Sequence, residues 1–279
     1  MGPRDIEDVR LVASAAFAEL EAAEDVPASR PEHARVRIEH LLGSDPGGCW
    51  VGESDGRVVG AAIALLREGL WGLSLLVVAP GHQSAGAGRA LLHRATAYGR
   101  DAHARVVLSS SDPRAVTAYL GLGLALHPAA AAQGRPHELP LSGAVRPGGA
   151  GDAELVAAVD RAVRGAAHGS DIDAHGSDID ALLRTGSRML VVEERGYAIV
   201  GEGAVRLLAA RDEEAAKELL RAALAGAEEM RVDWLTSDQQ WAFQVCREAG
   251  LSIRLGWGAL LTDGELGPMA PYLPSGAYL

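Results

Sequence analysis

Cysteine is scarce in this sequence, and the two cysteines that occur lie far apart. The chain has 279 residues and contains only Cys49 and Cys246, one in each half. Such a pair cannot build the disulfide framework of a small secreted protein, so we expect a cytoplasmic protein. Neither cysteine has a histidine and an acid close by in the sequence, so no cysteine nucleophile is indicated.

The sequence also lacks long apolar runs and an excess of positive charge. No run approaches the ~18 apolar residues that a membrane helix needs, and the acidic N-terminal residues do not fit a signal peptide. The net charge of −11 argues against nucleic acid as a partner. An acidic field would attract cationic substrates such as amines, although solubility is its commoner role.

The most informative feature present is an apolar segment followed by a glycine-containing loop. Residues 71–79 have the character of a buried strand, residues 80–88 form the loop, and residues 89–103 have a helical pattern. Gly86 and Gly88 let backbone N–H groups approach an anion, and a helix N-terminus adds its positive dipole end. The loop lacks the Lys-Ser/Thr of a Walker motif and the third glycine of a dinucleotide fingerprint.

The spacing Gln83-x-x-Gly86-x-Gly88 after Val78-x-Pro80 resembles the acetyl-CoA pyrophosphate loop of the GNAT superfamily of N-acetyltransferases. The expected elements around the loop have the order of that fold, so the resemblance covers about residues 3–130. They are helices over 5–23 and 32–42, a hairpin over 50–63 around Asp55-Gly56, a strand over 105–110 and a helix over 113–121.

The second half of the chain repeats this order more loosely. Residues 145–152 lead into a helix over 152–164, as residues 2–5 lead into the first helix. A hairpin is expected over 189–209, a helix over 212–227, a strand over 231–236 and a helix over 238–249. We therefore predict an α/β (α+β) fold of two tandem GNAT-like lobes, each a central mixed β-sheet flanked by helices.

We place the acetyl-CoA-binding lobe at residues 1–140 and a degenerate GNAT-like lobe at 141–279, with residues 129–136 as an irregular connector. Where the second lobe should have a pyrophosphate loop, residues 208–214 contain three acids and no glycine. Those carboxylates would repel phosphates, so only the first lobe is expected to bind the cofactor.

The resemblance implies acetyl-CoA as co-substrate and assigns roles to particular residues. Tyr119 is the expected general acid, because the family places such a tyrosine hydroxyl beside the cofactor sulfur and a phenol of pKa near 10 can protonate a thiolate. Ser84 and Ala85 replace a glycine and a basic residue that the family often has. The expected cofactor-binding residues are Val77, Val78, Gln83, Ser84, Ala85, Gly86, Ala87, Gly88, Arg89, Ala90 and Asp112.

The general base is not evident, because Ser74 stands on the strand where many members carry a glutamate. Glu68, Glu53 and the carboxylate of Leu279 are the remaining alternatives. The predicted activity is direct acetyl transfer to a primary amine of a small molecule or peptide, by a monomer or homodimer and without a metal. The alternative is a non-catalytic acyl-CoA-binding sensor or scaffold.

A seven-residue duplication occurs in the second half. Residues 167–173 and 174–180 both read Ala-His-Gly-Ser-Asp-Ile-Asp. His168, His175 and the aspartates could suggest a metal site, but no ligand spacing recurs elsewhere to complete one. We interpret the duplication as a slippage repeat in an exposed loop.

Overall fold

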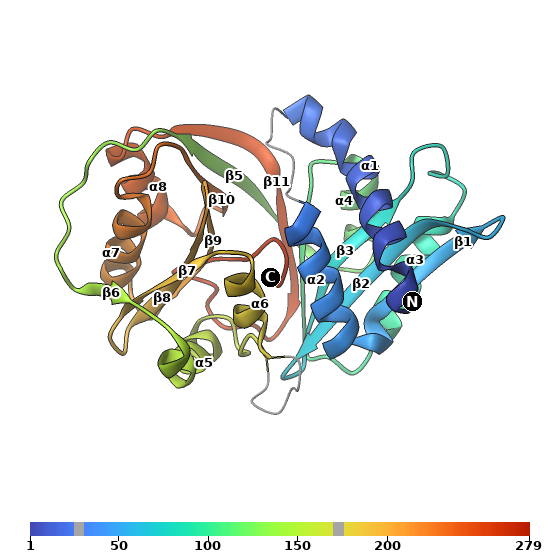
Figure 1. Ribbon diagram of the computed structural model, residues 1–279, viewed down its shortest axis with the longest axis horizontal. Coiled ribbons are helices and arrows are strands. Elements are labelled where there is room, and N and C mark those ends of the chain that lie inside the picture. The colour runs from blue at the N-terminus through green and yellow to red at the C-terminus, as the bar shows by residue number, and fades with distance from the viewer. Residues whose placement is uncertain (25–30, 170–175) are drawn as a thin grey trace.

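The computed structural model describes residues 1–24, 31–169 and 176–279, and its strands form one sheet with helices on both faces (Figure 1). This confirms the predicted mixed α/β class. The first half of the chain contributes, in order, α1 (Ile6–Glu24), α2 (Pro31–Ser44), β1 (Cys49–Ser54), β2 (Arg57–Arg67), β3 (Leu70–Val78), α3 (Ala87–Tyr98), β4 (Ala104–Ser109), α4 (Pro113–Leu120) and β5 (Ala125–Gly134).

The second half repeats a similar series. Its elements are β6 (Val145–Pro147), α5 (Ala153–Val163), α6 (Asp178–Arg184), β7 (Arg188–Val192), β8 (Gly196–Gly201), β9 (Ala204–Ala210), α7 (Glu213–Leu224), β10 (Met230–Leu235), α8 (Gln240–Glu248), β11 (Ser252–Gly264) and β12 (Tyr272–Leu273). Among the described residues, no helix combines the length and apolar character needed to cross a membrane.

The sheet runs without interruption through both halves of the molecule. Its strand order is β1-β2-β3-β4-β11-β5-β10-β9-β8-β7-β6, and β12 pairs with β9 beside this path. Strand β11 lies between β4 and β5 and pairs antiparallel with both. A strand from the end of the chain therefore completes the sheet of the first lobe.

The two faces of the sheet bury different sets of helices. On one face, apolar residues of α1, α2, α5 and α6 form a single core with β2, β3, β8 and β9. On the other face, α3 and α4 cover the first half of the sheet, and α7 and α8 cover the second. The end of the chain lies between the lobes, at the centre of the molecule (Figure 1).

The structure corrects several expectations. Residues 129–136 are not a connector, because most of them belong to β5, where Ala129–Ala132 are buried between β10 and β11. A run of alanines has no alternation, so its strand character comes from its two neighbours. Helix α3 occupies Ala87–Tyr98 rather than 89–103, since the chain turns at Gly99 against Trp71, where no Cβ would fit.

The interpretation of the duplicated segment as an exposed loop is also wrong for its described residues. His168 and Asp178 are both buried. His168 Nδ1 lies 2.8 Å from Asp160, and Asp178 contacts Arg67 and His40. His175 and the aspartates of the first copy lie outside the described residues.

Candidate active site

The first feature of the site is an opening between β3 and β4. These strands pair in parallel only from Leu70 opposite Ala104 to Leu73 opposite Val107. On its other side β3 carries a bulge at Ser74, because β2 residues Ile63 and Ala64 pair with Leu75 and Leu73. A bulge bends a strand and ends regular pairing. Beyond Ser74, the β4-facing edge of β3 therefore has no strand partner in the described ranges of the chain.

The loop after β3 leaves the N-terminus of α3 uncapped. Gly86 is the N-cap residue, has φ +90°, and offers no side chain to the amides of the first turn. Nothing would lie within 4 Å of an added Cβ, so the backbone conformation rather than space calls for glycine. Ala85 and Gly86 are exposed. The free amides and the helix dipole suit a phosphate.

Three side chains join this loop to α4. Arg114 Nη1 donates to Gln83 Oε1 at 2.6 Å, and Arg114 Nη2 lies 2.8 Å from Asp112 Oδ2. Asp112 is also the N-cap of α4, and its carboxylate accepts from the Arg114 backbone N–H. Hydrogen bonding by the Arg114 side chain lowers the pKa of Asp112. Two of the predicted cofactor-binding residues, Gln83 and Asp112, are thus linked through Arg114.

Sequence reasoning missed Arg114. It brings a guanidinium to a loop that has Ala85 where the family often has a basic residue, and its side chain is 62% exposed. The loop motif could not reveal it, since Arg114 lies 31 positions from Gln83 in sequence. The available signal was its place in the first turn of a helix that follows a neighbouring strand.

Tyr119 lies on α4 and belongs to a core cluster that includes residues of β3, β4, β11 and α3. The residue is 5% exposed. Burial and the nearby Asp112 carboxylate raise the pKa of Tyr119, so its phenol is protonated at neutral pH. No hydrogen bond joins its hydroxyl to a described residue, and the hydroxyl is not among the fully enclosed unpartnered atoms. Among the described residues, none therefore uses the proton of this hydroxyl.

The predicted valines lie on opposite faces of β3 at the opening. Val77 is buried in the core shared with α1, whereas Val78 packs toward α3 and would contact a Cβ on Gly88 at 3.5 Å. Gln83 Nε2 donates to the Val78 carbonyl at 3.3 Å. The end of β3, the loop and the first turn of α3 thus form one continuous surface.

None of the three candidate bases is placed as a free carboxylate at the opening. Glu68 precedes β3 at its paired end, where an ion pair with Arg161 lowers its pKa. Glu53 is exposed on β1, the edge strand of the sheet. The Leu279 main-chain oxygen accepts from His168 and from Tyr272 at 2.9 and 2.7 Å.

The second lobe lacks both features of the first. Asp212 caps α7 by accepting from the Ala215 N–H at 3.0 Å, and it also pairs with Arg195. Strand β9 pairs with β10 only at Ala204 and Val205, but β12 then pairs with β9 at Leu208 and Ala209. The position that corresponds to the opening is filled by the chain itself.

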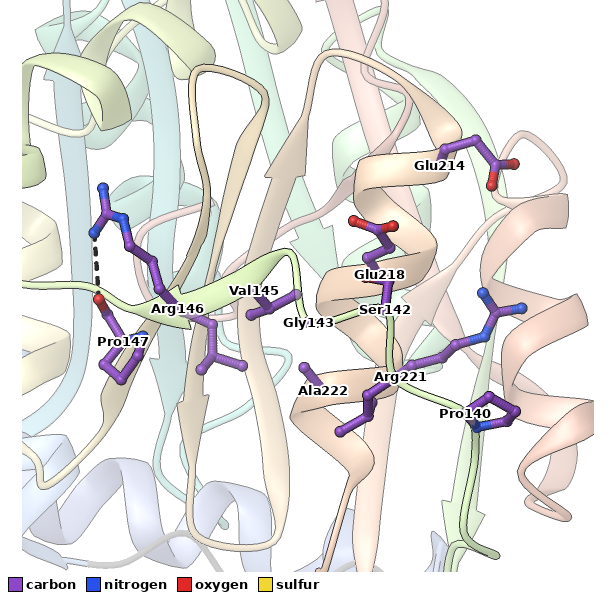
Figure 2. A pocket seen from close by; sticks show the side chains of 12 residues that line it. Pro140, Ser142, Gly143, Val145, Arg146, Pro147, Glu214, Glu218, Arg221 and Ala222 are labelled. Atoms are coloured by element: carbon purple, nitrogen blue, oxygen red, sulfur yellow. Dashed lines mark hydrogen bonds between the residues drawn. The ribbon is translucent and has the colours of Figure 1, made fainter.

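A cavity of about 350 Å³ lies elsewhere, between α7 and the segment that enters β6 (Figure 2). Glu214, Glu218 and Arg221 line it from α7, opposite Ser142 and Val145. It contains none of the predicted site residues. Within the described residues, no group of three His, Cys, Asp or Glu side chains could hold a metal ion.

Comparison with known proteins shows which family and fold this architecture resembles. Residues 14–124 match the acetyltransferase (GNAT) family. A proposed acetyltransferase from Pyrococcus horikoshii superposes with a TM-score of 0.74 at 19% identity, over 100% of this chain and 94% of that one. A GCN5-related N-acetyltransferase from Sphaerobacter thermophilus gives 0.60 at 16% identity, over 95% and 94%.

A tandem GNAT protein from the clavulanic acid biosynthesis pathway gives a TM-score of 0.56 at 17% identity, over 95% of this chain and 97% of that one. A comparison with curated proteins finds no match. The solved structures support the fold, and the family match covers the lobe that carries the opening and the loop. The family match identifies residues 14–124 as an acetyltransferase domain of the GNAT family. The solved structures show that the whole chain has the fold of two-lobe GNAT proteins.

Proposed function

We propose that the first lobe transfers an acetyl group from acetyl-CoA directly to a primary amine of a small molecule or peptide. The observation that carries the proposal is the opening between β3 and β4, which is followed in the chain by the uncapped N-terminus of α3. Tyr119 packs in the same core cluster as α3. We further propose that the lobes divide at residues 140 and 141, and that the protein acts in the cytoplasm as a monomer or homodimer.

The residues present fit acetyl-CoA. Amides of residues 83–90 would bind its pyrophosphate, with Arg114 adding a positive charge. The unpaired edge of Leu75–Val78 would hydrogen-bond the pantetheine arm as a neighbouring strand does. When bound, acetyl-CoA supplies an activated thioester. Tyr119 would donate its proton to the sulfur as the thioester bond breaks, and the proton lost by the newly acetylated amine would restore the phenol.

The two cysteines are unsuited to a covalent route. Both are buried as free thiols, and burial raises the pKa of each to about 12. The thiolate is the nucleophilic form, so neither is activated. Direct attack by the amine is the simpler route.

Calorimetric titration with acetyl-CoA, followed by a turnover assay with a panel of amines, tests this function. We expect one site per chain and acetyl transfer to at least one primary amine. Binding without any transfer would favour the alternative of a non-catalytic acyl-CoA sensor or scaffold. Absence of binding would refute both functions.

A further inference from the structure

The side chain of Arg37 reaches the bulge of β3 from the face opposite the pyrophosphate loop. Arg37 extends from α2, and its Nε donates to Ser74 Oγ at 2.8 Å. Ser74 in turn donates to the main-chain oxygen of Ala277 at 2.6 Å. The guanidinium is therefore held at the residue where β3 leaves β4.

Arg37 differs from its neighbours in having no acidic partner. Arg35, on the same helix, pairs with Glu39 at 2.7 Å, and the buried Arg67 pairs with Asp45 and Asp178. In the parts of the chain that the structure describes, no carboxylate lies within ion-pair distance of Arg37. Burial lowers the pKa of Arg37 to about 10, so the group remains charged at neutral pH.

A half-buried charge without a counter-ion costs free energy that a bound anion would recover. The Nε of Arg37 is used by Ser74, whereas its two Nη groups donate to no described residue and are not among the enclosed unpartnered atoms. Two adjacent Nη groups present the geometry that binds a carboxylate with two hydrogen bonds.

The surroundings of Arg37 contain Tyr278 and charged groups of both signs. Tyr278, from the end of the chain, packs edge-on against His40 of α2 with ring centroids 5.5 Å apart. Burial and the Asp178 carboxylate raise the pKa of Tyr278, whereas the guanidinium groups of Arg37, Arg184 and Arg67 lower it. Asp178 is already paired with Arg67 and His40, so it does not neutralise Arg37.

Arg37 lies on the face of the sheet opposite the pyrophosphate loop, so an acceptor that approaches the thioester from the side away from that loop would meet it. Tyr119 and the first turn of α3 are on the opposite face, whereas Ser74 and Leu75 turn toward α1 and α2. We propose that the acceptor amine carries a carboxylate and that the Nη groups of Arg37 bind this carboxylate beside the β3 bulge. This inference rests on the proposed function.

Pairs of acceptors that differ only in the carboxylate test this inference. Examples are L-alanine with ethylamine and L-phenylalanine with phenethylamine, each assayed with acetyl-CoA. R37Q should lower kcat/KM for the amino acid about tenfold or more, mainly through KM, because two charge-assisted hydrogen bonds are lost. For the matched amine, kcat/KM should change by less than about twofold. Comparing each acceptor between variants removes differences in intrinsic amine reactivity.

R35Q is the matched control, since Arg35 lies on the same helix and its side chain is 66% exposed. R35Q should leave kcat/KM unchanged for both the amino acid and its matched amine. R37K keeps the charge but not the paired Nη geometry, so its effect on the amino acids should be intermediate; it also replaces R37Q if that variant does not fold. Acetyl-CoA affinity should be unchanged in all three.

Equal effects of R37Q on both members of each pair, or no effect on either, would overturn the role of Arg37 and leave the acetyltransferase function standing. A wild-type preference for the amines without a carboxylate would do the same. If no amine of either kind is acetylated, the proposed function and this inference both fail, and the acetyl-CoA titration shows whether binding survives.

Discussion

The two lobes treat the same structural position in opposite ways. In the first lobe, α3 begins at a glycine whose conformation leaves the first amides free, and the edge of β3 beyond Ser74 has no partner. In the second, Asp212 satisfies the start of α7 and β12 pairs with the edge of β9. One lobe offers its hydrogen-bonding groups to a ligand, and the other uses them internally.

This contrast explains how a degenerate lobe can persist. Without a ligand, an unpaired strand edge can pair with another chain, and an uncapped helix end leaves backbone amides without a partner in the protein. The second lobe removes that liability with its own chain and supplies β11 to the sheet of the first lobe. We therefore propose that the second lobe gives structural support to the opening.

The largest expected effect comes from breaking the joint between the lobes. Asp178 of α6 forms a two-point contact with Arg67, at 2.8 and 2.9 Å, and a third with His40. Asp178→Asn should lower the free energy of unfolding by about 3–5 kcal/mol, because it leaves the buried Arg67 charge less compensated. Chemical denaturation measures this. Asp180→Asn, at the exposed cap of the same helix, is the control and should cost about 1 kcal/mol.

The same contact has a pH signature. Burial alone would raise the pKa of Asp178, but the His40 hydrogen bond and the Arg67 charge hold it well below its usual range. Its stabilisation is then complete above the unfolded-state pKa of about 3.9 and is lost as the pH falls below it. Denaturation between pH 3 and 5 should show a smaller loss for Asp178→Asn than for wild type; parallel curves would contradict this.

The next largest effect is expected when the N-cap of α3 is made acidic, like the N-cap of α7 in the second lobe. Gly86→Asp places a carboxylate where the pyrophosphate is expected and a side chain at φ +90°. Acetyl-CoA affinity should fall about 100-fold or more, which equals about 2.7 kcal/mol. Calorimetry measures this change. The reciprocal Asp212→Ala should leave affinity unchanged and lower stability by about 1 kcal/mol; weaker binding in that variant would contradict the division of labour.

A smaller effect is expected at the general acid. Tyr119→Phe should lower kcat about 30-fold, below the usual range for acid–base catalysis because a thiolate leaving group needs little help. Acetyl-CoA affinity should stay within about twofold. Tyr98→Phe, which removes a hydroxyl bonded to Asp45, should affect stability but not kcat. An unchanged kcat in Tyr119→Phe would refute the assignment.

The smallest effect is expected from deleting one copy of the repeat. The Asp178 N–H donates to the His168 carbonyl at 3.2 Å, and a Cβ on Gly169 would lie 3.0 Å from Ser177 Cα. Removing residues 170–176 joins Gly169 to Ser177 and restores one copy with both buried contacts. Because the contacts of His168 and Asp178 are kept, stability should change by less than about 1 kcal/mol. A large loss on denaturation would show that the duplicated residues contribute contacts of their own.

The local pattern of the first half was enough to predict its elements and family. A strand of apolar residues, a turn residue and glycines at fixed spacing are short-range signals, and β1 to α4 follow the predicted order. The elements of the second half were harder to predict from the sequence. Strand β11 has exposed residues such as Leu255, and its place between β4 and β5 depends on segments more than 100 positions away.

The sequence by itself determined the glycine-containing loop after β3, because glycine tolerates a left-handed backbone that other residues disfavour. It likewise determined the acids around Asp212, which are a matter of residue type. Only the tertiary structure decided which groups surround that loop. Arg114 meets Gln83, Arg37 meets Ser74, and β12 closes the second lobe through contacts between distant segments. Such contacts are set by packing and strand pairing across the sheet, and no local pattern encodes them.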